Sequence, residues 1–397
     1  VCKGFSNMNP IKKSSNPIRP RREKIIFLSA KNPLNKTEWS GIPYFMYKSL
    51  QQHFEVELMK GLKLRIIKKI GHYISQLSEK VFGKKYAFDY GILISLLYGI
   101  YYSARLLRKK NIRFIFCPAG LHELAFIQTK IPIISAGDCS TLQLVGYYPS
   151  LRNVHSVSIK EIAWVEKNAF SKIRLQLFSS RWAANFTHCH YGFSNIVDVA
   201  FGSNIFPKSS VEKMISLKKT IPFQLTFISL DWYRKGGDIV LDTVNVLISM
   251  RVPIHLTIIG CRPPNDFDRN HITIIEHLDK NAYGEIQTLE NILLSTHLVL
   301  LPTRADCTPI VVAEAFAFGI PVLASKTGGL PSMITDDING YLFEINEAGY
   351  YANKILEIFE DPMLYSRLAL GSLNTSKEIM NWEAWASTGI NAINKVL

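Results

Sequence analysis

The sequence predicts an α/β protein that contains parallel β-sheet and is divided into two domains. The clearest unit is residues 298–325, where the apolar runs 298–302 and 320–325 flank a helical segment that ends near Gly319. Consecutive parallel strands need such a crossover connection, so this unit indicates a parallel sheet. The chain has 397 residues, which is long for one hydrophobic core and suits two domains.

The first part of the chain begins with two buried strands and a turn between them. The runs 25–30 and 54–59 have the length and the apolar content of strands. Ser40 and Gly41 lie between them, just before a helix that includes residues 44–50. Backbone N–H groups at such a position can face a ligand, or the pair can form an ordinary tight turn.

The net charge of +14 is concentrated in two segments. Residues 1–24 hold seven Lys/Arg and one Glu, and residues 60–86 hold eight Lys/Arg and one Glu. The first segment is polar and rich in Pro and Asn, which predicts a disordered basic arm. The second predicts an amphipathic helix that either binds an anionic membrane surface or lies on the protein with solvated lysines. Nucleic-acid binding is not predicted, because the sequence has no recognised nucleic-acid motif.

Two further features argue against a membrane-spanning protein and against a disulfide-bonded or metal-binding one. The apolar segment 90–104 has fifteen residues, fewer than the roughly 20 that span a membrane, and therefore predicts a buried core helix. The six cysteines are scattered without CxxC spacing, which indicates reduced thiols in a cytoplasmic protein. His188, Cys189 and His190 are adjacent, and adjacent side chains seldom bind one ion, so no metal site is predicted.

Asp138 is the first candidate ligand-facing acid. The runs 112–118 and 131–140 predict two more strands, and Asp138 lies just past the end of the apolar part of the second. In open α/β sheets, ligands bind outside the carboxyl ends of the strands. Asp138 is therefore expected either to contact a ligand or to cap the next turn.

The later half of the chain places basic residues at a helix entrance. Arg234, Lys235 and Gly236 lie between a predicted strand at 224–230 and a helix that begins near residue 238. A lysine beside a helix N-terminus adds its charge to the positive end of the helix dipole, which suits a diphosphate. The alternative is a solvated turn.

Residues 306–314 supply the remaining polar groups. Thr308 is predicted to cap a helix whose first turn contains Pro309, and the N–H groups of Thr308, Ile310 and Val311 can receive a phosphate. Glu314 is the only charged residue from 310 to 325. It either faces a solvent slot at the sheet edge or accepts hydrogen bonds from a ligand hydroxyl, as acids do for ribose in doubly wound folds.

These motifs resemble a known family. Asp306-x7-Glu314, followed by EAFAFGIPVLAS and the Gly328-Gly329 turn, is similar to the signature of retaining GT-B glycosyltransferases of family 4. In that family the motif is Glu-x7-Glu, the second acid holds the donor ribose and the first faces the donor sugar. This chain has the shorter Asp306 at the first position, and residues 307–309 are Cys-Thr-Pro where the family usually has glycines.

The resemblance implies a GT-B fold, in which two doubly wound Rossmann-like domains face a cleft. It assigns residues 25–205 to an acceptor-binding domain, residues 206–376 to a nucleotide-sugar-binding domain, and residues 377–397 to a C-terminal helix that packs back on the first domain. Residues 1–24 remain the predicted basic arm.

The resemblance also assigns roles to single residues. The implied catalytic residues are Asp306, Lys235, Arg234 and Asp138. The implied donor-binding residues are Glu314, Thr308, Pro309, Ile310, Ser40, Gly41, Gly236, His277 and Leu278. The implied acceptor-side residues are Tyr44, Tyr147 and Tyr148.

The activity implied is the transfer of a hexosyl-type sugar, with retention, from a UDP- or GDP-linked donor to a glycan or lipid-linked acceptor. We expect no cofactor other than the nucleotide sugar as co-substrate, no metal, and a role in cell-surface polysaccharide or glycolipid synthesis. The expected location is cytoplasmic, peripheral on the inner face of the cell membrane and in contact with anionic lipid. The alternatives are a nucleotide-sugar epimerase on the same fold and a non-catalytic GT-B scaffold at the membrane.

Overall fold

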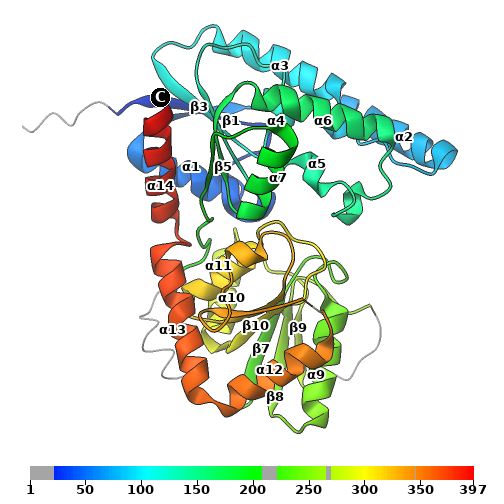
Figure 1. The fold of residues 1–397 in the computed structure, drawn as a ribbon, viewed down its shortest axis with the longest axis vertical. Coiled ribbons are helices and arrows are strands. Elements are labelled where there is room, and N and C mark those ends of the chain that lie inside the picture. The colour runs from blue at the N-terminus through cyan, green and yellow to red at the C-terminus, as the bar shows by residue number, and fades with distance from the viewer. Residues whose placement is uncertain (1–21, 208–220, 265–269, 345) are drawn as a thin grey trace, which may run out of the picture.

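The computed structural model describes residues 22–207, 221–264, 270–344 and 346–397. They form two six-stranded sheets, each flanked by helices, which lie one above the other in Figure 1. The strand pairs within both sheets are parallel. The α/β class is therefore confirmed. All but the last three residues of the predicted basic arm, 1–24, lie outside the described residues.

The first sheet has the order β2-β1-β3-β4-β5-β6. Its strands are β1 (Lys24–Ser29), β2 (Glu55–Lys60), β3 (Ile112–Pro118), β4 (Ile133–Gly137), β5 (Ile173–Phe178) and β6 (Ile196–Asp198). The central strands are continuous apolar runs because helices cover both of their faces. The helices are α1 (Ile42–His53), α2 (Arg65–Phe82), α3 (Ile92–Leu106), α4 (Leu121–Leu124), α5 (Thr141–Leu144), α6 (Ser156–Phe170) and α7 (Arg181–Tyr191). Three 3₁₀ turns, η1 (Glu38–Gly41), η2 (Phe88–Tyr90) and η3 (Pro149–Leu151), complete this part.

The second sheet has the order β12-β11-β10-β7-β8-β9. Its strands are β7 (Phe223–Ile228), β8 (Ile254–Ile259), β9 (Ile272–Ile275), β10 (Leu298–Leu301), β11 (Val322–Ser325) and β12 (Gly340–Phe343). The helices around it are α9 (Gly237–Ser249), α10 (Tyr283–Ser295), α11 (Ile310–Ala317), α12 (Ala348–Glu360) and α13 (Pro362–Glu378), with the 3₁₀ turn η4 (Leu330–Ser332). The sheets are thus separated in sequence between residues 198 and 223, a range that includes the predicted boundary at 206.

Each sheet has a hydrophobic core on both faces. In β1, Ile26 and Leu28 belong to one core cluster, and Ile25 and Phe27 belong to another. Successive residues of a strand point to opposite faces, so this alternation shows that the sheet is covered on both sides. The second sheet likewise divides its buried residues between two clusters.

The last helix, α14 (Trp382–Val396), returns to the first sheet. In Figure 1 α13 runs beside the second sheet and α14 beside the first, and the C-terminus lies at the first domain. Trp385 lies edge-on to Phe116 of β3, with ring centroids 5.9 Å apart, and Ser49 of α1 donates a hydrogen bond to the carbonyl of Trp382. The two tryptophans of the C-terminal segment therefore complete the core of the first domain.

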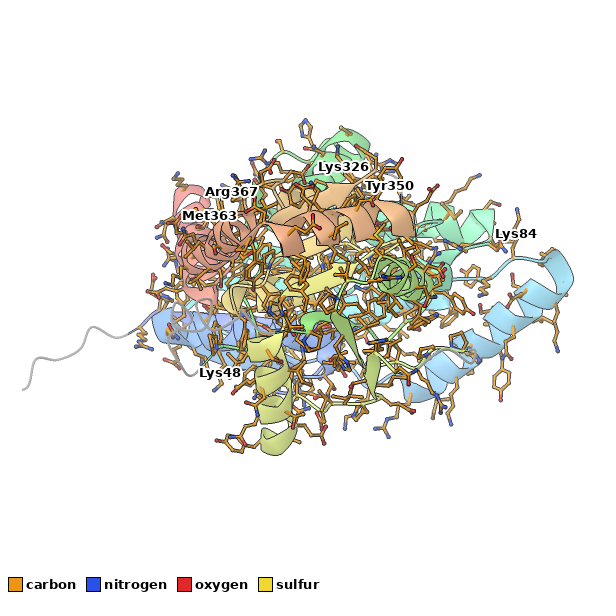
Figure 2. The ribbon with its side chains drawn as sticks, turned by 90° about the horizontal axis from the view of Figure 1, so that it is seen from below. Lys48, Lys84, Lys326, Tyr350, Met363 and Arg367 are labelled. Carbon is orange, nitrogen blue, oxygen red and sulfur yellow. The ribbon has the colours of Figure 1, made fainter. Side chains whose placement is uncertain are left out.

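Helix α2 has an unusual environment. Gly71 is its only buried residue. The side chains of Ile66, Ile70, Tyr73 and Leu77 follow one face, and each is more than half exposed. Figure 2 shows α2 extending from the body of the molecule, with Lys84 just beyond its end. Among the described helices, none is long and apolar enough to cross a membrane.

The start of α11 differs from the sequence prediction. Thr308 was expected to cap this helix, but Pro309 occupies the N-cap position without a side-chain cap. The Thr308 hydroxyl instead hydrogen-bonds to the Ser179 hydroxyl, at 2.6 Å, because the first domain approaches the loop at this point. The predicted end is confirmed: Gly319 follows the helix with a left-handed φ of 60°.

Candidate active site

The candidate site lies where β7 and β10 end and where α9 begins. Lys235 donates a hydrogen bond from its ammonium group to Asp306 Oδ2, and Arg234 Nη1 lies 4.0 Å from the same oxygen. Asp306 is only 5% exposed. A buried carboxylate requires compensation by opposite charge, and these two cations provide it. Both cations lie directly before the N-terminus of α9, so their positive charges add to the positive end of the helix dipole.

Arg234 is held in place by several contacts. Its Nε donates to Asp231 Oδ2 at 3.2 Å, and its Nη1 donates to the carbonyl of Ala305 at 2.9 Å. The guanidinium lies 5.0 Å from the centre of the Tyr148 ring, which belongs to the first domain. A cation over an aromatic face is attracted by the ring quadrupole. Arg234 is therefore positioned by both domains.

Two glycines allow the loops of the site to touch. A Cβ atom on Gly236 would lie 2.0 Å from the carbonyl oxygen of Pro302, and one on Gly328 would lie 1.7 Å from that of Asp306. Both residues also have a positive φ. Only glycine combines that conformation with such close approach. The Gly328-Gly329 turn thus packs against the backbone that carries Asp306.

Tyr147 and Tyr148 of the first domain contact this backbone directly. The Tyr147 hydroxyl accepts from the N–H of Asp306 at 2.9 Å and lies 3.0 Å from its carbonyl. The Tyr148 hydroxyl accepts from the N–H of Cys307 at 3.3 Å and lies 3.5 Å from Asp306 Oδ1. Burial, with the nearby Asp306 charge, raises the pKa of Tyr148 above its usual range. Both phenols therefore stay protonated and link the domains.

Asp138 follows β4 and faces the same region. Its Oδ2 accepts a hydrogen bond from Trp39 Nε1 at 3.2 Å. Burial raises the pKa of Asp138 to about 6, hydrogen bonds from Trp39 and Cys139 oppose this change, and the Asp306 charge adds to it. The two acids thus influence each other across the domains, and Asp138 is ionised at neutral pH.

Two cysteines meet between the domains. The sulfurs of Cys139 and Cys307 lie 3.3 Å apart, and Cys139 Sγ lies 3.6 Å from Asp138 Oδ1. The contact with Cys307, together with burial, raises the pKa of the Cys139 thiol. These two sulfurs and a carboxylate oxygen of Asp138 lie within 4.8 Å of one another. This group is distinct from residues 188–190, the adjacent His and Cys residues for which the sequence predicted no metal site.

Glu314 is paired inside the second domain. It is 1% exposed, and its Oε1 lies 2.5 Å from the ammonium group of Lys280. The possibility that Glu314 faces a solvent slot is therefore wrong. Lys280 also borders a small cavity together with Ser40 and Gly41. The N-terminal loop thus reaches the second domain beside the Glu314 ion pair.

The other predicted residues are placed as follows. Pro309 and Ile310 form the start of α11, next to Asp306. His277 is exposed and Leu278 half-buried, in the segment between β9 and α10. Tyr44 lies on α1, where the ammonium groups of Lys36 and Lys48 lie 5.3 and 6.0 Å from its ring centre. Among the ring contacts of the described residues, Tyr44 pairs with Phe45, whereas Tyr147 pairs with Tyr148 and Trp182.

Comparison with known proteins identifies the fold of this chain. Residues 222–361 match the family model described as "Glycosyl transferases group 1". The solved sucrose-phosphate synthase of Thermosynechococcus elongatus superimposes with a TM-score of 0.65 at 13% identity, over 94% of this chain and 99% of that one. The protein has the GT-B glycosyltransferase fold. The GT-B fold predicted from the sequence is therefore confirmed.

Other relatives have the same architecture or related sequences. The HepE protein of Anabaena, solved in complex with UDP, has a TM-score of 0.61 at 14% identity over 94% of this GT-B chain and all of its own. An uncharacterized glycosyltransferase of Methanocaldococcus jannaschii is 26% identical over 38% of this chain and 42% of its own length. The GDP-mannose-dependent monoacylated alpha-(1-6)-phosphatidylinositol monomannoside mannosyltransferase of Corynebacterium glutamicum is 25% identical over 56% of this chain. That alignment spans 60% of the relative, so less than two thirds of each of these two curated relatives is covered.

Three participants were missed by sequence reasoning. Trp39 holds Asp138, Ser179 binds the Thr308 hydroxyl, and Lys280 neutralises Glu314. Lys280 follows the predicted donor-binding residues His277 and Leu278, but its side chain was not predicted to pair with Glu314. Trp39 directly precedes the predicted donor-binding residues Ser40 and Gly41, and this position in the sequence was the signal that could have placed it at the site. Ser179 has no sequence signal, because its partner is far along the chain.

Proposed function

We propose that this protein is a retaining glycosyltransferase that takes its sugar from a nucleoside diphosphate sugar bound to the second domain. The observation that carries the proposal is the convergence of Arg234 and Lys235 with the N-terminus of α9 at Asp306. This arrangement concentrates positive charge where a diphosphate would leave. The match to group 1 glycosyl transferases over 222–361 supports the same assignment.

Catalysis would depend on stabilising the leaving group. When the bond between the sugar and the diphosphate breaks, negative charge develops on the diphosphate oxygens. Lys235, Arg234 and the backbone N–H groups at the start of α11 would stabilise that charge in a site with little water. The acceptor hydroxyl would attack from the face that the diphosphate leaves, and its proton would pass to the departing diphosphate.

The two acids would orient the donor sugar and ribose. Asp306 and Asp138 approach the site from opposite domains and can accept hydrogen bonds from sugar hydroxyls, as an ionised carboxylate does. Glu314 would accept hydrogen bonds from the ribose, with Lys280 balancing its buried charge. Ser40, Gly41 and Gly236 would allow the backbone to approach the phosphates, and His277 and Leu278 would cover the base.

The nucleotide is UDP or GDP in this proposal. Two solved neighbours with this fold are described in complex with UDP and with UDP-glucose, and one curated relative is named as GDP-mannose-dependent. The acceptor would be a glycan or a lipid-linked molecule bound to the first domain near Tyr147 and Tyr148. The product would contribute to cell-surface polysaccharide or glycolipid.

A thermal-shift screen against UDP, GDP, ADP and CMP tests the donor site, with wild type, Glu314→Gln and the exposed control Glu344→Gln. A ligand present at about 100 times its Kd stabilises a protein by roughly 2.7 kcal/mol. We expect UDP or GDP to stabilise wild type and the control but not Glu314→Gln. No stabilisation by any nucleotide would contradict the proposal and favour a scaffold. Conversion of the donor sugar without an acceptor would identify an epimerase instead.

We also propose that α2 docks on an anionic membrane surface from the cytoplasmic side. Its apolar face is exposed, with Ile70 at 52% and Leu77 at 63%, and lysines flank this face. An amphipathic helix of this kind binds by burying its apolar face while its cations meet anionic headgroups. We expect vesicles with anionic lipid to bind the protein at low salt and to release it at high salt.

The matched variants for this test are Ile70→Ser/Leu77→Ser on α2 and Leu370→Ser on α13, which is also exposed. The α2 variant should lose vesicle binding and the α13 variant should keep it. Equal binding to neutral vesicles would contradict the electrostatic part of the proposal.

A further inference from the structure

The first domain contains a cavity of 420 Å³ that the donor site does not use. It lies at the carboxyl ends of β1, β2 and β3, where Ala30, Gly61 and Ala119 border it. Ligands of open α/β sheets bind in this position. The volume falls within the range of roughly 300–1,000 Å³ that small-molecule sites have.

The cavity is lined by an excess of positive charge. Lys31, Lys63, Arg65 and Lys68 border it, whereas Asp89 and Glu123 are the acids in its lining. Among the described residues, Lys63, Arg65 and Lys68 form no ion pair, and Lys31 reaches only Glu38, at 4.0 Å. A cavity lined by several cations, three of them without an ion-pair partner among the described residues, favours an anionic ligand.

The start of α2 adds to this field. Its first residue, Arg65, lies at the cavity, and the helix has neither a side-chain cap nor an acidic residue in its first turn. A long helix that begins without such a group presents its positive dipole end and its N–H groups. The helix therefore supplies a second, backbone source of positive potential.

Two titratable side chains at the cavity wall, His122 and Glu123, have pKa values that are shifted toward the neutral form. Burial, with the charges of Lys68 and Lys31, lowers the pKa of His122 to about 4, so the imidazole is neutral at pH 7 and keeps one N–H donor. Among the described residues, the ring of His122 contacts Tyr90 and Tyr98 but has no hydrogen-bond partner. Burial also raises the pKa of Glu123 to about 7, which reduces the negative charge in the lining.

The cavity is connected to the reaction site by one side chain. Trp39 lines the cavity and donates its indole N–H to Asp138, which faces Asp306 of the other domain. A ligand that the lysines hold in the cavity therefore lies beside Trp39, which contacts Asp138 of the cleft. We propose that this cavity binds a phosphate ester group of the acceptor, so that a phosphorylated acceptor is the substrate class. The identification of this ligand as the acceptor rests on the proposed function, whereas the binding of a phosphate group does not.

The phosphate could belong to a soluble molecule or to a lipid headgroup, and two probes separate these sources. One is sn-glycerol 3-phosphate, titrated calorimetrically in the presence of UDP or GDP so that the cations of the donor site are occupied. The other is a phosphatidylcholine vesicle that contains phosphatidic acid. The cavity variant is Lys31→Gln/Lys68→Gln. The control is Lys110→Gln/Lys130→Gln, which removes two exposed lysines that lie outside the cavity lining and outside α2.

We expect the cavity variant to bind at least one of the probes about tenfold or more weakly than the control, since a hydrogen bond to a charged group is worth roughly 1.5–3 kcal/mol. Weaker binding of glycerol phosphate by the cavity variant identifies a soluble source, and weaker binding of the vesicle alone identifies a lipid source. Equal affinities of the two variants, or no binding of either probe, would overturn the inference. The UDP thermal shift reports separately on the proposed function, so failure of one is distinguishable from failure of the other.

Discussion

The substitution Glu123→Gln should change how stability depends on pH. Glu123 lies on α4 at the wall of the basic cavity, and its Oε2 accepts hydrogen bonds from the N–H of Ala30 at 2.9 Å and from the Tyr102 hydroxyl at 2.7 Å. Despite these bonds, burial raises the pKa of Glu123 from 4.5 to about 7. The folded state therefore holds the proton more tightly than the unfolded chain.

The sign and size of the effect follow from that difference. Stability from this proton is fully present below pH 4.5 and is lost as pH rises through about 7. This difference in pKa corresponds to about 3 kcal/mol in total, and most of it should be lost between pH 5 and pH 8. Glutamine keeps an acceptor oxygen for both donors and cannot ionise, so this loss should disappear.

The assay is urea unfolding followed by tryptophan fluorescence at several pH values. Wild type should lose about 2–3 kcal/mol more of its free energy of unfolding than Glu123→Gln between pH 5 and pH 8. The control Glu344→Gln, at a side chain that is 72% exposed, should retain the wild-type pH dependence. Parallel pH profiles for wild type and Glu123→Gln would refute the reasoning, because they would show that Glu123 has the same proton affinity in both states.

Further predictions concern the cleft. Lys235→Met should lower the kcat of sugar transfer by roughly 100-fold or more, because it removes a positive charge at the leaving group. The control Lys354→Met on α12 should keep the wild-type kcat. Equal kcat values for the two variants would contradict the role of Lys235. EDTA should leave transfer unchanged, and activity that is lost and then restored by a divalent ion would contradict metal independence. Tyr147→Phe should destabilise the protein by about 1–3 kcal/mol, because it leaves a buried N–H of Asp306 unpaired; an unchanged urea midpoint would contradict this. Diamide should oxidise Cys139 and Cys307 to a disulfide by accepting two electrons and two protons from the two thiols, since their sulfurs are 3.3 Å apart. Peptide mapping that finds both thiols free would contradict the contact.

Much of the second domain was predictable because its signals are local. The apolar run of β10, the glycine after α11 and the run of β11 are adjacent in sequence, and each has a local physical cause. The error at Thr308 has a different origin. A threonine before a proline has the local features of a cap, but Ser179, which is 129 residues away, binds its hydroxyl. Local rules do not include such a partner.

The partners of the buried acids show the same limit. The sequence indicated that Glu314 needs compensation, because a carboxylate in an apolar helix is costly to bury. It did not indicate that Lys280, 34 residues earlier, provides it. Trp39 and Asp138 are 99 residues apart and meet only because β1 and β3, then β3 and β4, are neighbours in the sheet.

The sequence by itself determined the α/β class and the basic amphipathic helix, and it named the charged residues of the candidate site. Hydrophobic periodicity, helix caps and the chemistry of single residues depend on a few neighbouring positions, so they can be recognised in one sequence. Only the tertiary structure decided which of these residues meet: Asp306 with Tyr147, Cys139 with Cys307, and four cations around one cavity. Those encounters depend on strand order and on how the two sheets face each other, which arise from packing over hundreds of residues.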